Sequence, residues 1–213
     1  MSSFKTIDDL DVQGKRVLVR LDLNVPMKDG RVTDSTRIDR SLATIRDLTA
    51  AGAAVLIMSH FGRPKGKVEP EMSLAPVARA LADALGRDIA FAMDCVGPEA
   101  EKAAQAVSPG GVAMLENLRF YAEEEANDIE FAGKLAGLGN LYVNDAFSCA
   151  HRAHASTEAI ARLLPSAAGR LMQAELDALS HALESPQRPV AALVGGAKIS
   201  SKMTVLGNLI KQV

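Results

Sequence analysis

The chain has 213 residues, with 24 lysines and arginines against 26 aspartates and glutamates and a formal net charge of −2. Hydrophobic residues make up 48% of it, enough to fill a core, so the composition excludes global disorder. The small net charge argues against a protein that binds nucleic acid or anionic membranes, which needs a large basic excess. The length accommodates one large domain, or one domain and part of another.

Cysteine content and the N-terminal segment indicate a cytoplasmic protein. Cys95 and Cys149 are too few for a disulfide scaffold, and we expect two reduced thiols. The first ten residues contain Asp8 and Asp9 and no apolar stretch, so we expect no signal peptide. The longest apolar run, residues 50–58, is too short to span a bilayer and is typical of a helix end followed by a buried strand.

Apolar runs and amphipathic segments alternate along the chain. The runs predict strands at residues 16–21, 55–58, 89–91, 112–115, 141–143 and 190–194. Helical spacing predicts helices at residues 38–52, 73–86, 129–138, 172–183 and 200–213, with Ser73 as an N-cap and Gly52 and Gly86 as stops. Such alternation indicates a three-layer α/β fold, a parallel sheet with helices on both faces. Two prolines within residues 185–189 mark the best domain boundary, after a connecting helix.

Polar clusters follow five of the predicted strands, at the edge where open α/β sheets bind ligands. The clusters are at residues 22–26, 59–64, 116–120, 144–154 and 195–198. Each alone has an ordinary explanation: Asp22, Asn24 and Pro26 suit a turn, and a single arginine is usually solvated. His151 and His154 have the spacing of metal ligands but no third ligand in the motif, so we predict no metal site. The coincidence of five clusters at one edge is harder to explain as five separate turns.

The basic residues of these clusters predict an anion pocket. They are Arg37, His60, Arg63, Arg119 and Arg152. Arginine binds phosphate and carboxylate oxygens in a bidentate manner, so the expected ligand is a small molecule with several negative groups.

A second phosphate-bearing ligand is indicated near residue 195. Gly195 and Gly196 form a glycine turn, and Lys198 and Lys202 share one face at the start of the predicted helix, whose N-terminus is itself partly positive. The stretch does not fit the P-loop pattern, and two solvated lysines remain an equal alternative.

Six segments together resemble the phosphoglycerate kinase family, in the family's order and spacing. They are VLVRLDLNVP (17–26), HFGRP (60–64), LENLRF (115–120), NDAF (144–147), AHRAHA (150–155) and GGAK (195–198). Two departures are visible: Phe61 stands where leucine is common, and Ser148-Cys149 where Gly-Thr is common. Neither departure removes a charged group.

The resemblance implies a Rossmann-like first domain of a two-domain kinase of glycolysis. The enzyme would transfer a phosphoryl group between 1,3-bisphosphoglycerate and ADP, giving 3-phosphoglycerate and ATP, with Mg²⁺. The implied domains are a 3-phosphoglycerate-binding domain at residues 1–168, an interdomain helix and linker at 169–189, and the truncated start of a nucleotide-binding domain at 190–213.

The family's pattern also implies a role for each matching residue. The substrate-binding residues would be Asp22, Asn24, Arg37, His60, Arg63, Arg119 and Arg152. The nucleotide-binding residues would be Gly195, Gly196, Lys198 and Lys202. Arg37 and Lys198 would be catalytic, by stabilising the phosphoryl group in flight.

The resemblance further suggests a fragment, because the family's chain is about twice as long. We expect this chain to bind 3-phosphoglycerate without turnover and to bind no Mg²⁺ by itself. The full-length protein would be a cytoplasmic monomer, whereas the fragment could self-associate through an exposed strand edge at residues 190–213. The alternatives are a non-catalytic binding module for a small phosphorylated acid and an unrelated α/β enzyme with the same strand-end geometry.

Overall fold

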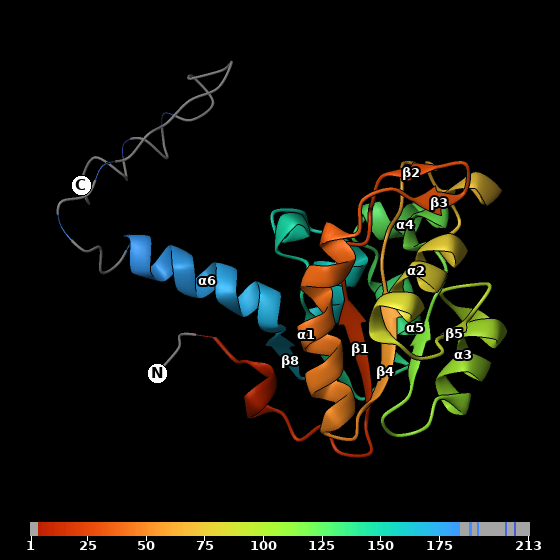
Figure 1. Ribbon diagram of the computed structural model, residues 1–213, viewed down its shortest axis with the longest axis horizontal. Helices are drawn as coiled ribbons and strands as arrows, with labels where there is room; N and C mark the ends of the chain where they lie inside the picture. The colour runs from red at the N-terminus through yellow and green to blue at the C-terminus, as the bar shows by residue number, and fades with distance from the viewer. Residues whose placement is uncertain (1–3, 184–187, 189–190, 192–202, 204–206, 208–213) are drawn as a thin grey trace. The chain divides into compact units, whose positions relative to one another are not determined.

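The computed structural model describes residues 4–183 together with 188, 191, 203 and 207 (Figure 1). The chain divides into two compact units, residues 1–173 and 174–213. Apart from residues 191, 203 and 207, the strand predicted at 190–194 and the helix predicted at 200–213 lie outside the described residues. Within the described part, no helix is both long and apolar enough to cross a membrane.

The first unit is built on a six-stranded sheet in the order β5-β6-β4-β1-β7-β8, and every pair of neighbouring strands is parallel. The strands are β1 (Arg16–Arg20), β4 (Ala54–Met58), β5 (Ala90–Phe91), β6 (Val112–Met114), β7 (Leu141–Asn144) and β8 (Ser166–Ala168). The predicted parallel sheet is confirmed. The edge strand β8 was not predicted, because its three residues are Ser-Ala-Ala and give no β-branched or aromatic signal.

A short antiparallel hairpin stands apart from the sheet. It joins β2 (Met27–Lys28) to β3 (Arg31–Val32), and it lies at the upper right of Figure 1. Asp29 and Gly30 both have positive φ at the turn, the conformation that a two-residue hairpin loop requires.

The helices connect the strands, and several shorter helical turns lie between them. The α-helices are α1 (Thr36–Ala50), α2 (Ala75–Leu85), α3 (Gly97–Ala106), α4 (Ala122–Glu125), α5 (Ile129–Ala136) and α6 (Arg170–Leu183). The shorter turns are η1 (Ile7–Asp9), η2 (Pro70–Met72), η3 (Leu118–Phe120), η4 (Phe147–Cys149), η5 (Ala155–Ala159) and η6 (Ile160–Arg162). Helix α3 was missed because its buried face consists of Ala100 and Ala104, too small to show as an apolar stripe.

The start of α2 requires a correction of one residue. Leu74 occupies the N-cap position, and Ser73 precedes it. The Ser73 hydroxyl still accepts a hydrogen bond from the Ala75 N–H at 3.1 Å, so it acts on the first turn from outside the cap. Gly86 ends the helix in the left-handed conformation, with φ of 68°, as predicted.

Two separate cores cover the two faces of the sheet. On β4, Val55 and Ile57 contribute to the core formed with α1 and α2, whereas Leu56 and Met58 contribute to the core formed with α3 and α5. Because successive side chains of a strand point to opposite faces, an uninterrupted apolar run supplies both cores. The predicted three-layer α/β architecture is therefore confirmed.

The register of the sheet determines where its loops meet. Arg20 of β1 pairs with Met58 of β4 on one side and with Asn144 of β7 on the other. The three loops that follow therefore leave the sheet at one level. The chain passes from β1 first to one side of the sheet and only later to the other, and open α/β sheets form a ligand crevice at such a switch point.

Candidate anion-binding site

A pocket of about 270 Å³ lies beyond the carboxyl ends of the central strands. Its lining residues are Asp22, Asn24, Arg37, His60, Gly62, Arg63, Arg119, Ser148, Cys149 and Arg152. All seven residues predicted to bind substrate are among them. The structure thus brings together side chains that lie up to 130 positions apart, while their contacts with a substrate stay a prediction.

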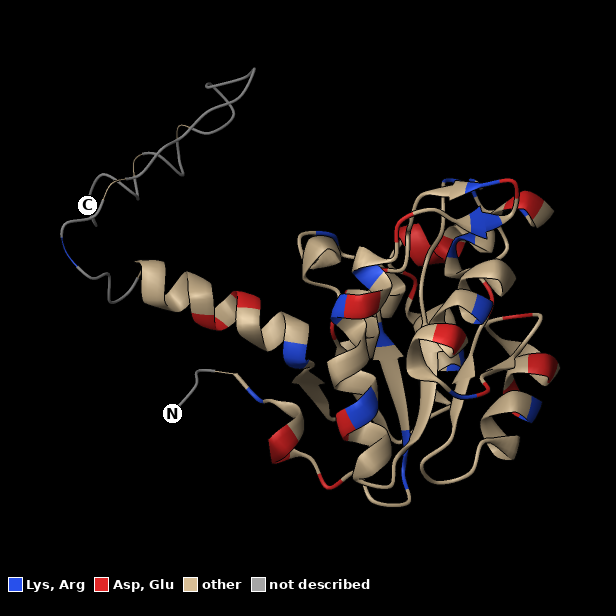
Figure 2. Ribbon diagram, viewed as in Figure 1, with Lys and Arg blue, Asp and Glu red and all other residues tan. Residues whose placement is uncertain are grey.

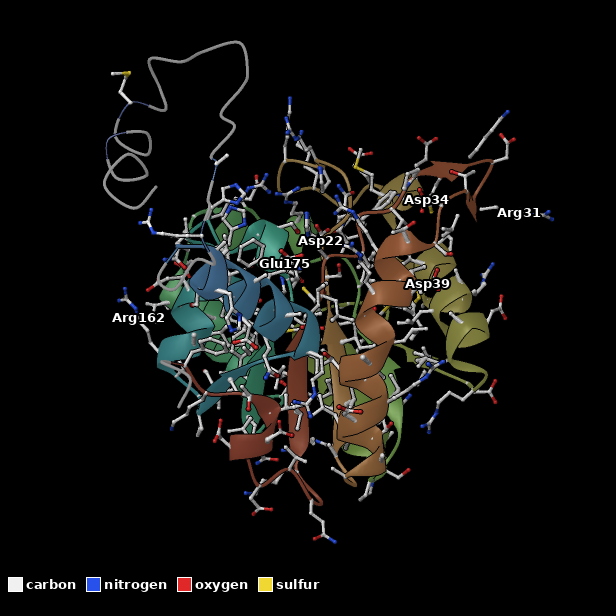
Figure 3. All side chains as sticks on the ribbon, turned by 60° about the vertical axis from the view of Figure 1, so that its left-hand side comes forward. Asp22, Arg31, Asp34, Asp39, Arg162 and Glu175 are labelled. Atoms are coloured by element: carbon white, nitrogen blue, oxygen red, sulfur yellow. The ribbon has the colours of Figure 1, made fainter. Side chains whose placement is uncertain are left out.

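Each side chain reaches the pocket from a loop or helix end. Asp22 and Asn24 follow β1, and Arg37 is the second residue of α1. His60 and Arg63 follow β4, Arg119 lies in η3, and Arg152 follows η4. Asp22 lies at the upper end of the sheet in Figure 3.

Asp22 is held by three neighbours. Its Oδ2 atom accepts hydrogen bonds from the Arg37 guanidinium and from the Ser148 hydroxyl, and its Oδ1 atom accepts from the Asn24 N–H at 3.2 Å. Burial opposes ionisation of this carboxyl, but the Ser148 hydrogen bond and the Arg37 charge prevail and lower its pKa. Asp22 is therefore an ionised anchor that orients Arg37 at the pocket.

The loop after β4 is held from two sides. The Asn24 side-chain oxygen accepts from the Gly62 N–H at 3.0 Å, and Arg119 Nη1 donates to the Gly62 carbonyl at 2.8 Å. Gly62 has φ of 60°, a conformation that favours glycine, and a Cβ atom there would require the Met72 side chain to move. Asn24 and Arg119 thus position this loop in addition to lining the pocket.

Asn117 is a positioning residue that sequence reasoning did not single out. Its side-chain oxygen accepts from the N–H groups of Phe61 and Arg119, both at 3.1 Å. Its amide nitrogen donates to the carbonyls of Phe61 at 2.8 Å and Met72 at 2.9 Å. The amide is fully used, and it joins the loops that carry His60 and Arg119.

The charge of the pocket is strongly positive. Arg37, Arg63, Arg119 and Arg152 face Asp22, the one carboxylate in the lining. Arg119 is 7% exposed, and burial lowers its pKa from the usual arginine value. Its Nε atom lies 3.1 Å from Glu125 Oε1, an ion pair whose angle is not that of a hydrogen bond. Over the outer helices, by contrast, acidic and basic residues are interspersed (Figure 2).

A second cavity of about 330 Å³ extends the site. It shares Arg63, Arg119 and Arg152 with the first and adds Lys65, Glu125 and His154. The shared arginines can therefore reach an elongated ligand with negative groups at both ends. The Ser148 hydroxyl donates to Asp22, but Asp22 is ionised and paired with Arg37, so the arrangement suits binding and charge neutralisation more than nucleophilic attack.

Metal binding does not fit these residues. Within the described part of the chain, Asp22, His60 and Cys149 have donor atoms within 4.8 Å of one another. Asp22 is already engaged by Arg37 and Ser148, and the surrounding arginines would repel a divalent cation. His151 and His154 line different cavities, and His154 Nδ1 lies 3.8 Å from the buried Glu124 carboxylate.

The predicted nucleotide-binding residues lie outside the described residues. They are Gly195, Gly196, Lys198 and Lys202. Their grouping and the catalytic role of Lys198 remain predictions.

The family model for phosphoglycerate kinase matches residues 7–213. The chain belongs to the phosphoglycerate kinase family. The phosphoglycerate kinase of a Ruegeria species is 59% identical over 210 residues, which cover 99% of this chain and 53% of that protein. The phosphoglycerate kinase of Methylobacterium radiotolerans is 61% identical over 214 residues, with 100% and 54% covered. The chain therefore spans about half the length of these relatives.

Solved structures of phosphoglycerate kinases share the fold. The enzyme from Coxiella burnetii matches with a TM-score of 0.89 and 43% identity, covering 99% of this chain and 53% of that one. The enzyme from Pyrococcus horikoshii matches with a TM-score of 0.85 and 36% identity, covering 97% and 52%. The resemblance read from the six motifs is confirmed by these comparisons.

Ser148 and Cys149 are pocket residues that the motif analysis noted only as departures from the phosphoglycerate kinase pattern. Ser148 adds a hydroxyl that donates to Asp22, and Cys149 is buried in the wall. Their position directly before the His-Arg segment was the available signal. The sequence could not show that η4 turns Ser148 toward Asp22, 126 positions earlier in the chain.

Proposed function

We propose that this chain is the substrate-binding half of a phosphoglycerate kinase, which binds 3-phosphoglycerate and 1,3-bisphosphoglycerate for glycolytic phosphoryl exchange with ADP and ATP. The observation that carries the proposal is the arginine-rich pocket lined by all seven predicted substrate residues. Four arginines around one anchored carboxylate match a ligand with a phosphate and a carboxylate.

The chemistry of the reaction agrees with such a lining. The phosphoryl acceptor is a carboxylate, which is ionised well below pH 7 and needs no general base. Phosphoryl transfer depends mainly on positioning and on neutralising charge. Arg37 is half-exposed and held by Asp22, and it supplies a positive charge for the group in transfer.

The remaining assignments concern the longer protein. We propose the domain boundaries 1–168, 169–189 and 190–213, with Gly195, Gly196, Lys198 and Lys202 contacting ATP or ADP. The cations around the pocket do not fit Mg²⁺, so Mg²⁺ would enter with the nucleotide. A monomeric full-length state and a cytoplasmic location remain predictions.

Titration calorimetry of the purified chain with 3-phosphoglycerate at low salt tests the binding role. We expect saturable binding that Arg119→Met weakens about tenfold or more, because a buried charge-assisted contact is lost. The matched control is Arg79→Met on the exposed face of α2, which should bind as the unchanged chain does. Absence of binding by the folded, unchanged chain would overturn the proposal.

A coupled assay for ATP formation tests whether the chain catalyses the reaction without the rest of the protein. We expect the chain alone to show no turnover with 1,3-bisphosphoglycerate and ADP, and the protein encoded by a longer source gene to be active. Clear turnover by the purified chain would contradict this. A source gene that ends at residue 213 would instead favour the alternative, a non-catalytic binding module for a small phosphorylated acid.

A further inference from the structure

A buried arginine lies directly behind the wall of the pocket. Arg20, the last residue of β1, is 1% exposed and is absent from the pocket lining. Its Nη2 atom lies 3.0 Å from Nδ1 of His60, which does line the pocket. Arg20 thus contacts the Nδ1 edge of the imidazole ring from outside the pocket lining, and Nε2 is the other ring nitrogen.

The chemistry of this contact determines which ring nitrogen carries the hydrogen. A guanidinium has only donors, so His60 Nδ1 must be the acceptor. A neutral imidazole with an accepting Nδ1 carries its hydrogen on Nε2. We propose that Arg20 is a positioning residue that holds His60 as the Nε2–H tautomer, so that the pocket receives a neutral N–H donor for an anionic oxygen. The identity of the ligand in this proposal rests on the proposed function.

A chain of hydrogen bonds explains how the fold accommodates the buried guanidinium of Arg20. Arg20 Nε donates to Ser156 Oγ at 2.8 Å, and that hydroxyl donates to Glu124 Oε1 at 2.6 Å. The Ser156 N–H also donates to Glu124 Oε2 at 2.9 Å, and Glu124 is fully buried. The Ser156 hydroxyl therefore links Arg20 to the negative charge of Glu124, which balances the guanidinium. The remaining Arg20 donors are available to His60 and to the Leu21 carbonyl.

The surroundings of His60 keep the ring neutral. Burial lowers its pKa most, and the charges of Arg20, Arg119 and Arg152 lower it further against the opposing charge of Asp22, to about 2. A neutral donor adds direction without adding charge beside the four arginines. Anion binding should therefore not depend on His60 ionisation between pH 5 and 8.

Nitrogen-resolved NMR of the histidines tests the proposal in the unchanged chain without ligand. The two neutral tautomers and the imidazolium have different ¹⁵N shift patterns. We expect His60 to show the Nε2–H pattern, with no titration between pH 5 and 8. An Nδ1–H pattern, or a His60 signal that titrates in this range, would overturn it.

Two variants test whether Arg20 is responsible. Arg20→Lys keeps a charged donor and should retain the Nε2–H pattern. Arg20→Met removes the donor, so we expect mixed tautomers, a higher His60 pKa and about threefold to tenfold weaker 3-phosphoglycerate binding at pH 8. As pH falls, protonated His60 would recover part of this loss relative to the unchanged chain at the same pH.

The control is again Arg79→Met, which should leave both tautomer and binding unchanged. If Arg20→Met does not fold, an Nδ1–H pattern in the unchanged chain or in Arg20→Lys would still overturn the proposal. A folded Arg20→Met that keeps the pure Nε2–H pattern would overturn the positioning role. Because the tautomer is measured without ligand, absence of 3-phosphoglycerate binding would contradict only the proposed function.

Discussion

At the scale of single residues, the pocket depends on polar atoms that already have a partner before any ligand arrives. Asp22 holds Arg37, Asn24 holds the Gly62 N–H, and Arg20 holds His60. Each arrangement fixes a donor or a charge in the geometry that an anion needs, which lowers the entropy cost of binding. Changes at these residues should therefore alter affinity and turnover.

Arg37→Ala in the full-length enzyme should separate binding from chemistry. We expect turnover to fall roughly 10²-fold or more, because the positive charge that neutralises the transferring group is lost, while 3-phosphoglycerate affinity falls far less. Steady-state kinetics and calorimetry on the same preparation would measure both quantities. Equal losses would show that Arg37 binds the ground state and the transition state alike.

Ser148→Ala should change the acid stability of the chain. The Asp22 pKa is lowered below 3.8, so its contribution to stability is complete above that pH and is lost as pH falls through the folded-state value. Removing the Ser148 hydrogen bond raises the Asp22 pKa, and acid unfolding should begin at a higher pH.

The loss of stability at pH 7 should be about 1 kcal/mol. Urea unfolding at pH 7 and through the acid range measures both effects. An acid-unfolding midpoint that does not move would show that the Ser148 hydrogen bond does not lower the Asp22 pKa.

At the scale of elements, side-chain hydrogen bonds join the loops beyond the strands to one another and to the following helix. Asn117 connects the loops after β4 and β6, and Asp145 connects the end of β7 to the start of α6 by accepting from the Met172 N–H at 3.0 Å. Loops of this kind are ordered by buried side-chain hydrogen bonds because they have no ladder of their own.

Asn117→Ala should weaken both stability and binding. The change leaves the Phe61 and Met72 carbonyls without a partner, for a loss of about 2–3 kcal/mol in the free energy of unfolding. The loops carrying His60 and Arg119 would also lose their connection, so 3-phosphoglycerate affinity should fall. Denaturation and calorimetry measure the two effects. Full affinity in the variant would mean that the loops are ordered without Asn117.

Gly169→Ala should destabilise the junction between β7 and α6. A Cβ atom at Gly169 would collide with the Asp145 carboxylate, so we expect a loss of about 1–3 kcal/mol. Gly133→Ala in α5 is the control, because nothing lies within 4 Å of its added Cβ atom.

That control should instead gain about 0.5–1 kcal/mol, because alanine favours a helix more than glycine does. Urea midpoints of the two variants decide the matter. A neutral Gly169→Ala would show that Asp145 can move without loss of the junction.

At the scale of the whole molecule, the net charge of −2 conceals a local excess of positive charge. Four arginines meet in the pocket, whereas acidic and basic residues alternate over the outer helices (Figure 2). Attraction of an anionic ligand therefore arises from the charges of the pocket. Dissolved salt can screen these charges where the pocket opens to solvent.

Salt should weaken 3-phosphoglycerate binding to the chain. The screening length falls from about 10 Å at 0.1 M ionic strength to about 3 Å at 1 M, so we expect a several-fold lower affinity at the higher value. Calorimetry at both salt concentrations measures the change, and circular dichroism verifies that the fold is retained. Affinity independent of salt would imply that charge attraction contributes little.

Much of the architecture was predictable because apolar runs and helical spacing are local patterns. The central strands and the helices α1, α2 and α5 follow from them directly. The exceptions have local causes as well: β8 is three small residues, and the buried face of α3 is alanine. Pocket residues were predictable for a related reason, since parallel strands bring their carboxyl ends to one edge.

The sequence by itself determined the layered α/β fold, the family and the set of charged residues at the edge of the sheet. Tertiary structure alone decided which of them touch. Ser148 meets Asp22 across 126 positions, and Arg20 meets Ser156 across 136. Such pairs depend on strand register and loop path, which many weak interactions determine together. No local pattern of residue types therefore encodes which donor meets which acceptor, or which partner contacts the His60 ring.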